Sequence, residues 1–198
     1  LEKFSIAANS LGGYISWNYT LKYPQKVDKL ILIDSVGYKQ DMPWLLNFAV
    51  NPLVRPFARR SFPRFFIHKA VNQVYGDPSK ATDDVRNRYF ELAMREGNKS
   101  AWIDIFMEMK KYSSLETLSD GINNIPRPVL VMWGSKDTWI PYDEIFPKWK
   151  KDLPNAKFIV YEGVGHIPME EIPKESARDA HLFLSGKTAE SKLTYNKK

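Results

Sequence analysis

Residues Phe4 to Tyr14 read FSIAANSLGGY, and this stretch decides the fold. A short apolar run leads to Ser10, and two glycines and a helix-like segment follow. This is the pattern of a nucleophile elbow, a sharp strand-to-helix turn that exposes a serine hydroxyl and needs small residues two positions before and after it. Ala8 and Gly12 meet that need. Taken alone, the residues also fit a strand that ends in a Gly-rich turn, with Ser10 as a helix cap.

Strand and helix patterns alternate on both sides of a long helical interruption. The expected order is strand, helix, strand, several helices, strand, helix, strand and helix, at residues 5–8, 11–22, 27–34, 36–121, 129–133, 142–152, 157–161 and 173–184. The first strand is mostly apolar, so we expect it to be buried on both faces. A strand, a helix and a strand within about thirty residues predict a right-handed parallel crossover. Open parallel sheets place their sites at the carboxyl ends of strands, which is where Ser10 falls.

The interruption contains a basic and aromatic run. Arg55 to Lys69 holds five basic residues and no acid, interleaved with Phe57, Phe62, Phe65 and Phe66. Such a run suits nucleic acid or an anionic membrane surface. We favour instead a helix pair whose aromatic face packs inward and whose arginines lie in water. We therefore expect no nucleic-acid partner and keep a membrane surface as a less favoured alternative.

Composition restricts the class of protein. The 198 residues are 43% hydrophobic, enough for one domain with an insertion. There is no cysteine, so disulfides and thiol nucleophiles are excluded, while the compartment is left open; our default expectation is a soluble cytoplasmic protein. No run reaches the ~18 apolar residues needed to span a bilayer. Residues 186–198 carry four lysines and one glutamate and predict a flexible basic tail.

Three chemically competent side chains follow predicted strands, namely Ser10, Asp137 and His166. A serine hydroxyl becomes a nucleophile when an imidazole takes its proton and a carboxylate orients that imidazole. The spacing therefore predicts a Ser-Asp-His triad. Asp34 also follows a predicted strand and is our second candidate for the acid. Since the chain has few histidines, its paired acids such as Glu170 and Glu171 do not predict a metal site.

These motifs resemble those of the α/β-hydrolase superfamily. The sequence NSLGG at 9–13 is similar to its elbow, WGSKDTWIP at 133–141 to its acid turn, and GVGHIPMEE at 163–171 to its histidine loop. The resemblance implies an α/β fold with a mainly parallel sheet, helices on both faces and an inserted helical cap. The core would be residues 1–35 and 122–185, and the cap residues 36–121.

The resemblance also implies roles for further residues. The backbone N–H of Leu11 would hold an oxyanion, and no cofactor or metal would be needed. Asn9, Trp139 and Ile167 lie within or beside the three motifs, and we expect them to contact substrate. His68 and His181 lack a strand-end context, so we expect them to be structural or exposed.

The implied function is hydrolysis of a carboxylic ester through an acyl-enzyme. Aromatic residues in the cap predict an apolar or aromatic substrate of moderate size. One alternative is a carbon–carbon bond hydrolase of ring-cleavage products with the same triad, and another is a non-catalytic binding protein on a hydrolase scaffold. Epoxide hydrolases and haloalkane dehalogenases carry aspartate at the elbow, so Ser10 argues against both.

One feature departs from the family pattern. The family has several strands before the elbow and a loop among them that gives a second oxyanion donor, and neither is in this sequence. We therefore expect the chain to be the carboxyl-terminal part of a longer hydrolase, with the amino-terminal segment as its partner. The elbow strand would then have an unpaired edge.

Overall fold

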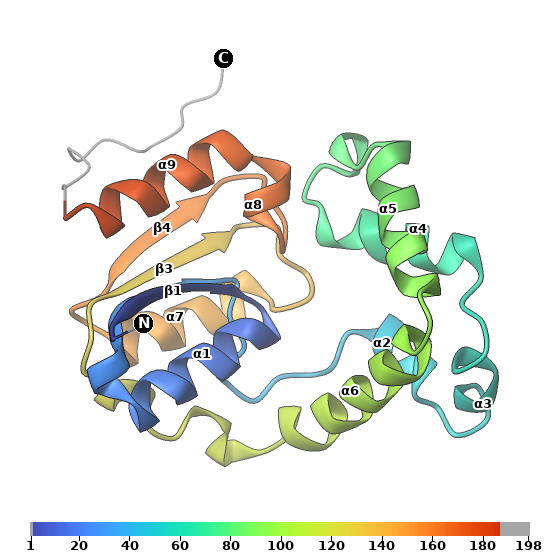
Figure 1. Cartoon of the computed structure of the whole chain (residues 1–198), viewed down its shortest axis with the longest axis horizontal. Helices are drawn as coiled ribbons and strands as arrows, with labels where there is room; N and C mark the ends of the chain where they lie inside the picture. The colour runs from blue at the N-terminus through green and yellow to red at the C-terminus, as the bar shows by residue number, and fades with distance from the viewer. Residues whose placement is uncertain (1, 187–198) are drawn as a thin grey trace.

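The computed structural model describes residues 2–186 and is built on one parallel sheet (Figure 1). Its strands in spatial order are β1 (Phe4–Asn9), β2 (Val27–Ile33), β3 (Val129–Gly134) and β4 (Lys157–Tyr161). All three pairings are parallel, as predicted. The predicted tail lies outside the described residues beyond Gly186.

Helices cover both faces of the sheet, which confirms the expected layers (Figure 1). α1 (Leu11–Lys22) and α7 (Tyr142–Asp152) pack on one face, and α9 (Pro173–Leu184) packs on the other. Side chains alternate along a strand, so Leu30 and Leu32 of β2 meet the first layer while Ile31 and Ile33 meet the second. This double burial explains the uninterrupted apolar run that identified β2.

Residues 36–121 contain helices and no strand among the described residues, as the sequence predicts. The helices are α2 (Trp44–Ala49), α3 (Arg55–Ala58), α4 (Arg64–Val74), α5 (Asp83–Met94) and α6 (Asn98–Ser113). They enclose a buried cluster of their own, separate from the two clusters beside the sheet. Thr82 is the N-cap residue of α5, because its Oγ1 accepts the N–H of Val85 at 3.3 Å.

Short helical turns complete the chain, and the sequence did not predict them. They are η1 (Pro24–Lys26), η2 (Pro78–Lys80), η3 (Glu116–Ser119), η4 (Ile122–Asn124) and α8 (Pro168–Glu171). Proline stands at the first or second position of three of them, η1, η2 and α8, where its missing N–H costs nothing. Among the described residues, no helix is both long and apolar enough to cross a bilayer.

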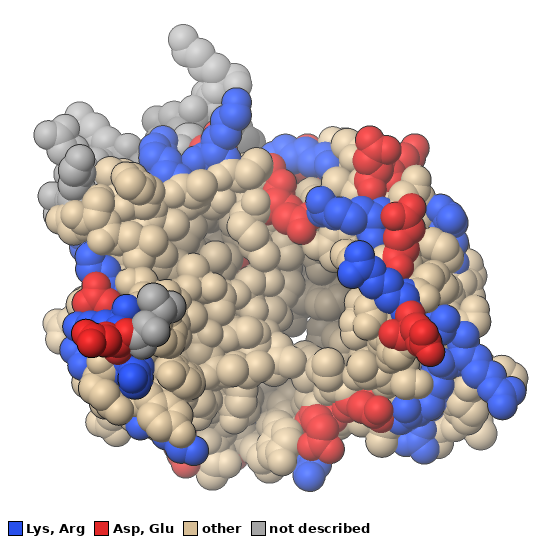
Figure 2. Space-filling view, viewed as in Figure 1, with Lys and Arg blue, Asp and Glu red and all other residues tan. Residues whose placement is uncertain are grey.

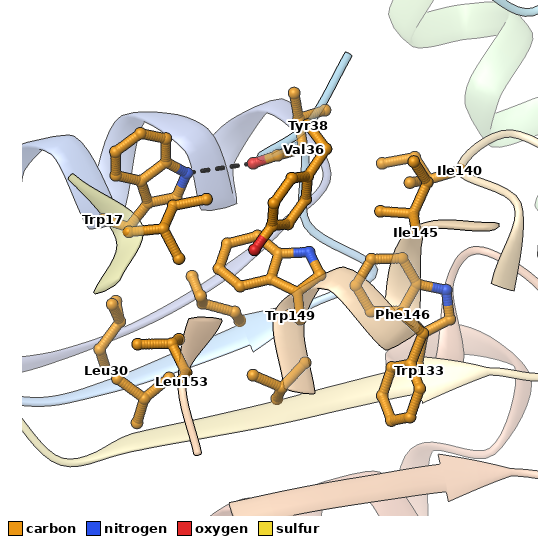
Figure 3. Close-up of a cluster of buried hydrophobic side chains, with 14 of the residues drawn as sticks. Trp17, Leu30, Val36, Tyr38, Trp133, Ile140, Ile145, Phe146, Trp149 and Leu153 are labelled. Atoms are coloured by element: carbon orange, nitrogen blue, oxygen red, sulfur yellow. Dashed lines mark hydrogen bonds between the residues drawn. The ribbon is translucent and has the colours of Figure 1, made fainter. Parts of the chain in front are cut away.

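Side chains of Trp17, Tyr38 and Trp149 hold the segment that follows β2 against the helices on the sheet. Trp17 Nε1 donates to Val36 O at 3.1 Å (Figure 3). Tyr38 packs edge-to-face on Trp149 at 5.3 Å, and its hydroxyl lies 3.0 Å from Asp152 Oδ2. The chain therefore enters the helical segment at a fixed place beside the elbow.

Two expectations about burial were wrong. β1 is not buried on both faces, because it lies at the edge of the sheet and Ser5 and Ala7 are exposed. Its only strand partner among the described residues is β2, so the expected unpaired edge is confirmed. The aromatic residues of the basic run do not all pack inward: Phe62 is buried, but Phe57 and Phe65 are exposed.

Candidate active site

The turn after β1 has the backbone of an elbow. Ser10 has φ 54° and ψ −124°, outside the regions that L-residues ordinarily occupy. Four hydrogen bonds hold it there: its N–H donates to Ile33 O at 3.0 Å, and its carbonyl accepts from Gly13 N at 2.9 Å, Val36 N at 3.1 Å and Tyr14 N at 3.4 Å. Packing of α1 against β2 thus maintains the strained residue.

Glycine is needed at the elbow for space. A Cβ at Gly13 would lie 2.1 Å from Ser35 Oγ, far inside contact distance. A Cβ at Gly12, the position that the sequence pattern emphasised, would meet only Ala8 Cβ at 3.6 Å. The tightest approach of α1 to the sheet is therefore at Gly13.

Asp137 and His166 form a buried hydrogen-bonded pair. His166 Nδ1 lies 2.8 Å from Asp137 Oδ2, and both residues are 4% exposed. The other carboxylate oxygen accepts N–H groups of Trp139 at 2.8 Å and Ile140 at 3.0 Å, which fixes the carboxylate. Because Nδ1 faces the acid, Nε2 is the ring nitrogen left for a reacting group.

Ser10 and His166 line one cavity of about 510 Å³. Its walls come from the elbow, the histidine loop and the helical segment, and they are mostly apolar; Phe62, Phe66 and Trp102 are among them. The surface is hollowed between the sheet and the helical segment (Figure 2). The fold therefore brings a hydroxyl and an imidazole, distant in sequence, to one apolar chamber, and the carboxylate of Asp137 is bonded to that imidazole behind the chamber wall.

Comparison with known proteins agrees with this fold. A family model described as alpha/beta hydrolase fold matches residues 1–173. The chain belongs to the α/β-hydrolase fold family. Curated α/β-hydrolase relatives include Lipase 1 of Psychrobacter immobilis, 32% identical over 184 residues, and Lipase 3 of Moraxella sp. (strain TA144), 30% identical over 185 residues. Each match covers 91% of this chain and 55% or 56% of the relative, so the chain spans little more than half their length.

Other similar proteins are named as hydrolases of hydroxy-oxo-hexadienoic acids and not as lipases. A 2-hydroxy-6-oxo-6-(2'-aminophenyl)hexa-2,4-dienoic acid hydrolase of Metapseudomonas resinovorans is 24% identical and is covered to 60% of its length, over 92% of this chain. Among solved structures, the 2-hydroxy-6-oxo-6-phenylhexa-2,4-dienoate hydrolase of Rhodococcus sp. strain RHA1 superimposes with a TM-score of 0.76 at 22% identity, covering 93% of this chain and 64% of that one. At this identity the superposition supports the fold.

Asn9, Trp139 and Ile167 all line the cavity of this α/β hydrolase. The amide of Asn9 is occupied, because Nδ2 donates to Ile33 O at 3.0 Å and to His166 O at 2.9 Å. The Trp139 ring lies 5.9 Å from the His166 ring, and its buried Nε1 has no partner among the described residues. Substrate contact by these three stays a prediction, and the bonds of Asn9 favour a positioning role.

Leu11 is the first residue of α1. The first N–H groups of a helix have no acceptor within the helix, and they point out of its N-terminus. Leu11 also lines the cavity beside Ser10. Its role as oxyanion donor stays a prediction that this placement supports.

Glu171 anchors the histidine loop, and the sequence analysis missed this role. Its buried carboxylate accepts N–H groups of Gly165 at 2.8 Å, Gly76 at 2.9 Å and Asp77 at 2.9 Å. His166 N also donates to Val74 O at 2.8 Å. The histidine loop is therefore held against the end of α4. Glu171 is the last residue of the histidine motif GVGHIPMEE, and this position is the sequence feature from which its role could have been inferred.

Asp34 lies beside the pair but does not replace Asp137. It is fully buried, and its Oδ1 accepts the N–H of Gly134 at 2.9 Å while Oδ2 has no partner among the described residues. Burial, and then the neighbouring charge of Asp137, raise the pKa of Asp34 well above its ordinary value. Asp34 bonds the backbone of Gly134, whereas the direct contact of His166 is with Asp137, so Asp137 is the candidate triad acid.

The same three residues are the candidate metal ligands of the described chain. One ligand atom from each of Asp34, Asp137 and His166 lies within 4.8 Å of the others. The direct 2.8 Å bond between Asp137 and His166 directs the imidazole toward the acid, as a triad requires. His68 is half-buried on α4 and His181 is exposed on α9, and neither lines the cavity.

Proposed function

We propose that this chain carries the triad of a serine hydrolase that cleaves carboxylic esters. The observation that carries the proposal is that His166, whose Nδ1 lies 2.8 Å from Asp137 Oδ2, lines the same cavity as the strained Ser10. Curated relatives named as lipases support it. The residues supply every group that acyl transfer needs, apart from a second oxyanion donor.

In the proposed mechanism, Ser10 Oγ attacks the ester carbonyl while His166 Nε2 takes the hydroxyl proton. Asp137 holds the ring and stabilises its positive form, and the N–H of Leu11 donates to the developing oxyanion. Collapse of the intermediate breaks the bond to the alcohol, which leaves with the proton from His166. Water, deprotonated by His166, then releases the acid and restores Ser10.

The apolar cavity supports an apolar or aromatic ester of moderate size. Phenylalanine and tryptophan side chains from α4 and α6 line it, and these helices belong to the segment that we propose as the cap, residues 36–121. The core would be residues 1–35 and 122–185. Because few polar groups line the chamber, a charged acyl group would lose hydration there without replacement.

A second oxyanion donor would come from an amino-terminal segment of the same protein. The chain spans little more than half of its curated relatives, and the outer edge of β1 is unpaired among the described residues. A strand beside β1 would satisfy that edge and bring a loop close to Ser10. Loss of one oxyanion donor typically costs ~2.7 to 4 kcal/mol of transition-state stabilisation.

A carbon–carbon bond hydrolase with the same triad is the second candidate. Relatives from Metapseudomonas resinovorans and Rhodococcus, named as hydrolases of hydroxy-oxo-hexadienoic acids, favour it. A panel of nitrophenyl esters and a 2-hydroxy-6-oxo-dienoate separates the two functions by their kcat/KM values.

The test is labelling by a fluorophosphonate and hydrolysis of short nitrophenyl esters by the complete polypeptide. We expect Ser10→Ala to abolish both, and Ser5→Ala, an exposed serine on β1, to leave both unchanged. Unchanged esterase activity in Ser10→Ala would refute the assignment. A folded parent protein that fails to react with the probe would support instead a non-catalytic binding protein.

A further inference from the structure

The helical segment presents an exposed apolar rim. Leu53, Phe57 and Phe65 are 84%, 74% and 70% exposed, the highest values for large apolar side chains among the described residues. Trp44 and Phe48 beside them are about half exposed. We call these five residues the aromatic rim. Single exposed apolar side chains are ordinary, but Phe48, Phe57 and Phe65 line one outer cavity, and Trp44 and Leu53 lie on the same stretch of 22 residues. A group of exposed apolar side chains of this kind typically marks an interaction surface.

Cations lie beside the rim. Arg55 to Lys69 holds five basic residues and no acid, and of these only Arg59 forms an ion pair among the described residues, with Asp104. The Lys69 ammonium lies 4.7 Å from the Trp44 ring centroid, which places a charge directly on the rim. Lys and Arg atoms gather at the lower right in Figure 2, where α3 lies in Figure 1.

An aromatic series connects the rim to the active-site cavity. Phe48 lies 6.1 Å from Phe66, Phe66 lies 5.8 Å from Phe62, and Phe62 lies 6.5 Å from Trp102. Phe62 and Phe66 line both the active-site cavity and a second, outer cavity of about 390 Å³ that Phe57 and Arg60 also line. A molecule against the rim is thus separated from the chamber of Ser10 by two aromatic side chains.

We propose that the aromatic rim docks this protein on an anionic lipid surface. The apolar side chains would enter the boundary between headgroups and acyl chains, and the flanking cations would contact headgroup phosphates. Charge argues against a second copy of the chain, because a two-fold interface would bring two sets of these cations together. Docking itself does not depend on the proposed function, although access of a lipid acyl chain to Ser10 rests on it.

The experiment is co-sedimentation of the complete polypeptide with phosphatidylcholine vesicles, with and without phosphatidylglycerol. We expect binding to the anionic vesicles, and its loss in about 1 M salt, where charges are screened beyond about 3 Å. The triple variant Leu53→Ser, Phe57→Ser, Phe65→Ser should lose about tenfold or more of the parent's affinity for the vesicles. Arg60→Glu should weaken binding about fivefold or more, because it reverses a charge beside the rim.

Leu184→Ser is the control for the replacement of an exposed apolar side chain by serine, as in the triple variant. Leu184 is 40% exposed on α9, at the opposite end of the molecule from α3 (Figure 1), so its replacement should leave vesicle binding unchanged. The changed residues are exposed, so the variants should retain the parent circular dichroism and melting temperature.

Equal binding by the parent and the folded triple variant would overturn the proposal, as would no binding by the parent. Dimerisation in light scattering that the triple variant abolishes, without vesicle binding, would assign the rim to a second copy and would also overturn it. Ser10→Ala should bind vesicles like the parent. A parent protein that binds vesicles but hydrolyses no ester would count against the enzymatic proposal alone.

Discussion

Replacement of Asn9 by alanine tests whether this residue positions the histidine loop or binds substrate. Its amide joins the end of β1 to Ile33 O at 3.0 Å and to His166 O at 2.9 Å, across 157 positions of sequence. The change to alanine removes both bonds and leaves the local backbone conformation accessible. If the amide positions His166, the variant should lose stability and turnover together.

The size of the effect follows from the partners. Two intramolecular hydrogen bonds contribute about 1–3 kcal/mol together. After the change, the Ile33 carbonyl keeps the N–H of Ser10 at 3.0 Å as a donor. The His166 carbonyl has no second donor within residues 2–186, so we expect a loss of about 1–2 kcal/mol. A displacement of about 1 Å at a reacting group can lower the rate about 100-fold, so kcat should fall between about tenfold and 100-fold.

Urea unfolding and steady-state hydrolysis of a nitrophenyl ester measure the two effects. Asn18→Ala is the control, because Asn18 Nδ2 donates to Tyr14 O at 3.0 Å within α1 and is outside the cavity; it should lose about 0.5–1.5 kcal/mol and no turnover. Asn9→Asp should be worse than Asn9→Ala, since it faces two carbonyl oxygens with a carboxylate. The positioning role would be refuted by a stable Asn9→Ala whose KM alone rises, the behaviour of a substrate contact.

Two further substitutions test the surroundings of the triad. Asp34→Asn should raise the free energy of unfolding at pH 7, because burial and the neighbouring Asp137 raise the pKa of Asp34 and so make its charged form unfavourable in the folded protein. The pKa of Asp34 is higher in the folded than in the unfolded protein, so the parent becomes less stable as the pH rises through this range. The advantage of the variant should therefore vanish below about pH 4. A difference in urea-unfolding free energy between parent and variant that stays the same from about pH 4 to about pH 7 would contradict the prediction. Gly13→Ala should lose about 1–3 kcal/mol through its clash with Ser35, and the double variant with Ser35→Gly should recover most of it. Gly12→Ala is the control, and thermal unfolding should show that it is as stable as the parent or more so. An equal loss of stability in both variants would exclude the clash with Ser35 as the cause.

Much of the local structure could be predicted because its causes are local. The predicted helices at 11–22, 142–152 and 173–184 have the bounds observed for α1, α7 and α9, since apolar spacing, prolines and strand-end turns limit them. The burial of β1 could not be predicted in this way. It depends on which helix covers each face of an edge strand, and the apolar content of four residues does not contain that information.

The sequence by itself determined the type and order of the elements and placed Ser10, Asp137 and His166 after strands. Parallel strands end at one edge of a sheet, so this placement was enough to predict that the three would converge. Only the tertiary structure decided which carboxylate bonds His166, that Asn9 and Glu171 hold its loop, and that the aromatic rim faces solvent. These properties are distances between segments far apart in the chain, set by how helices pack on the sheet and on one another, and no local pattern encodes them.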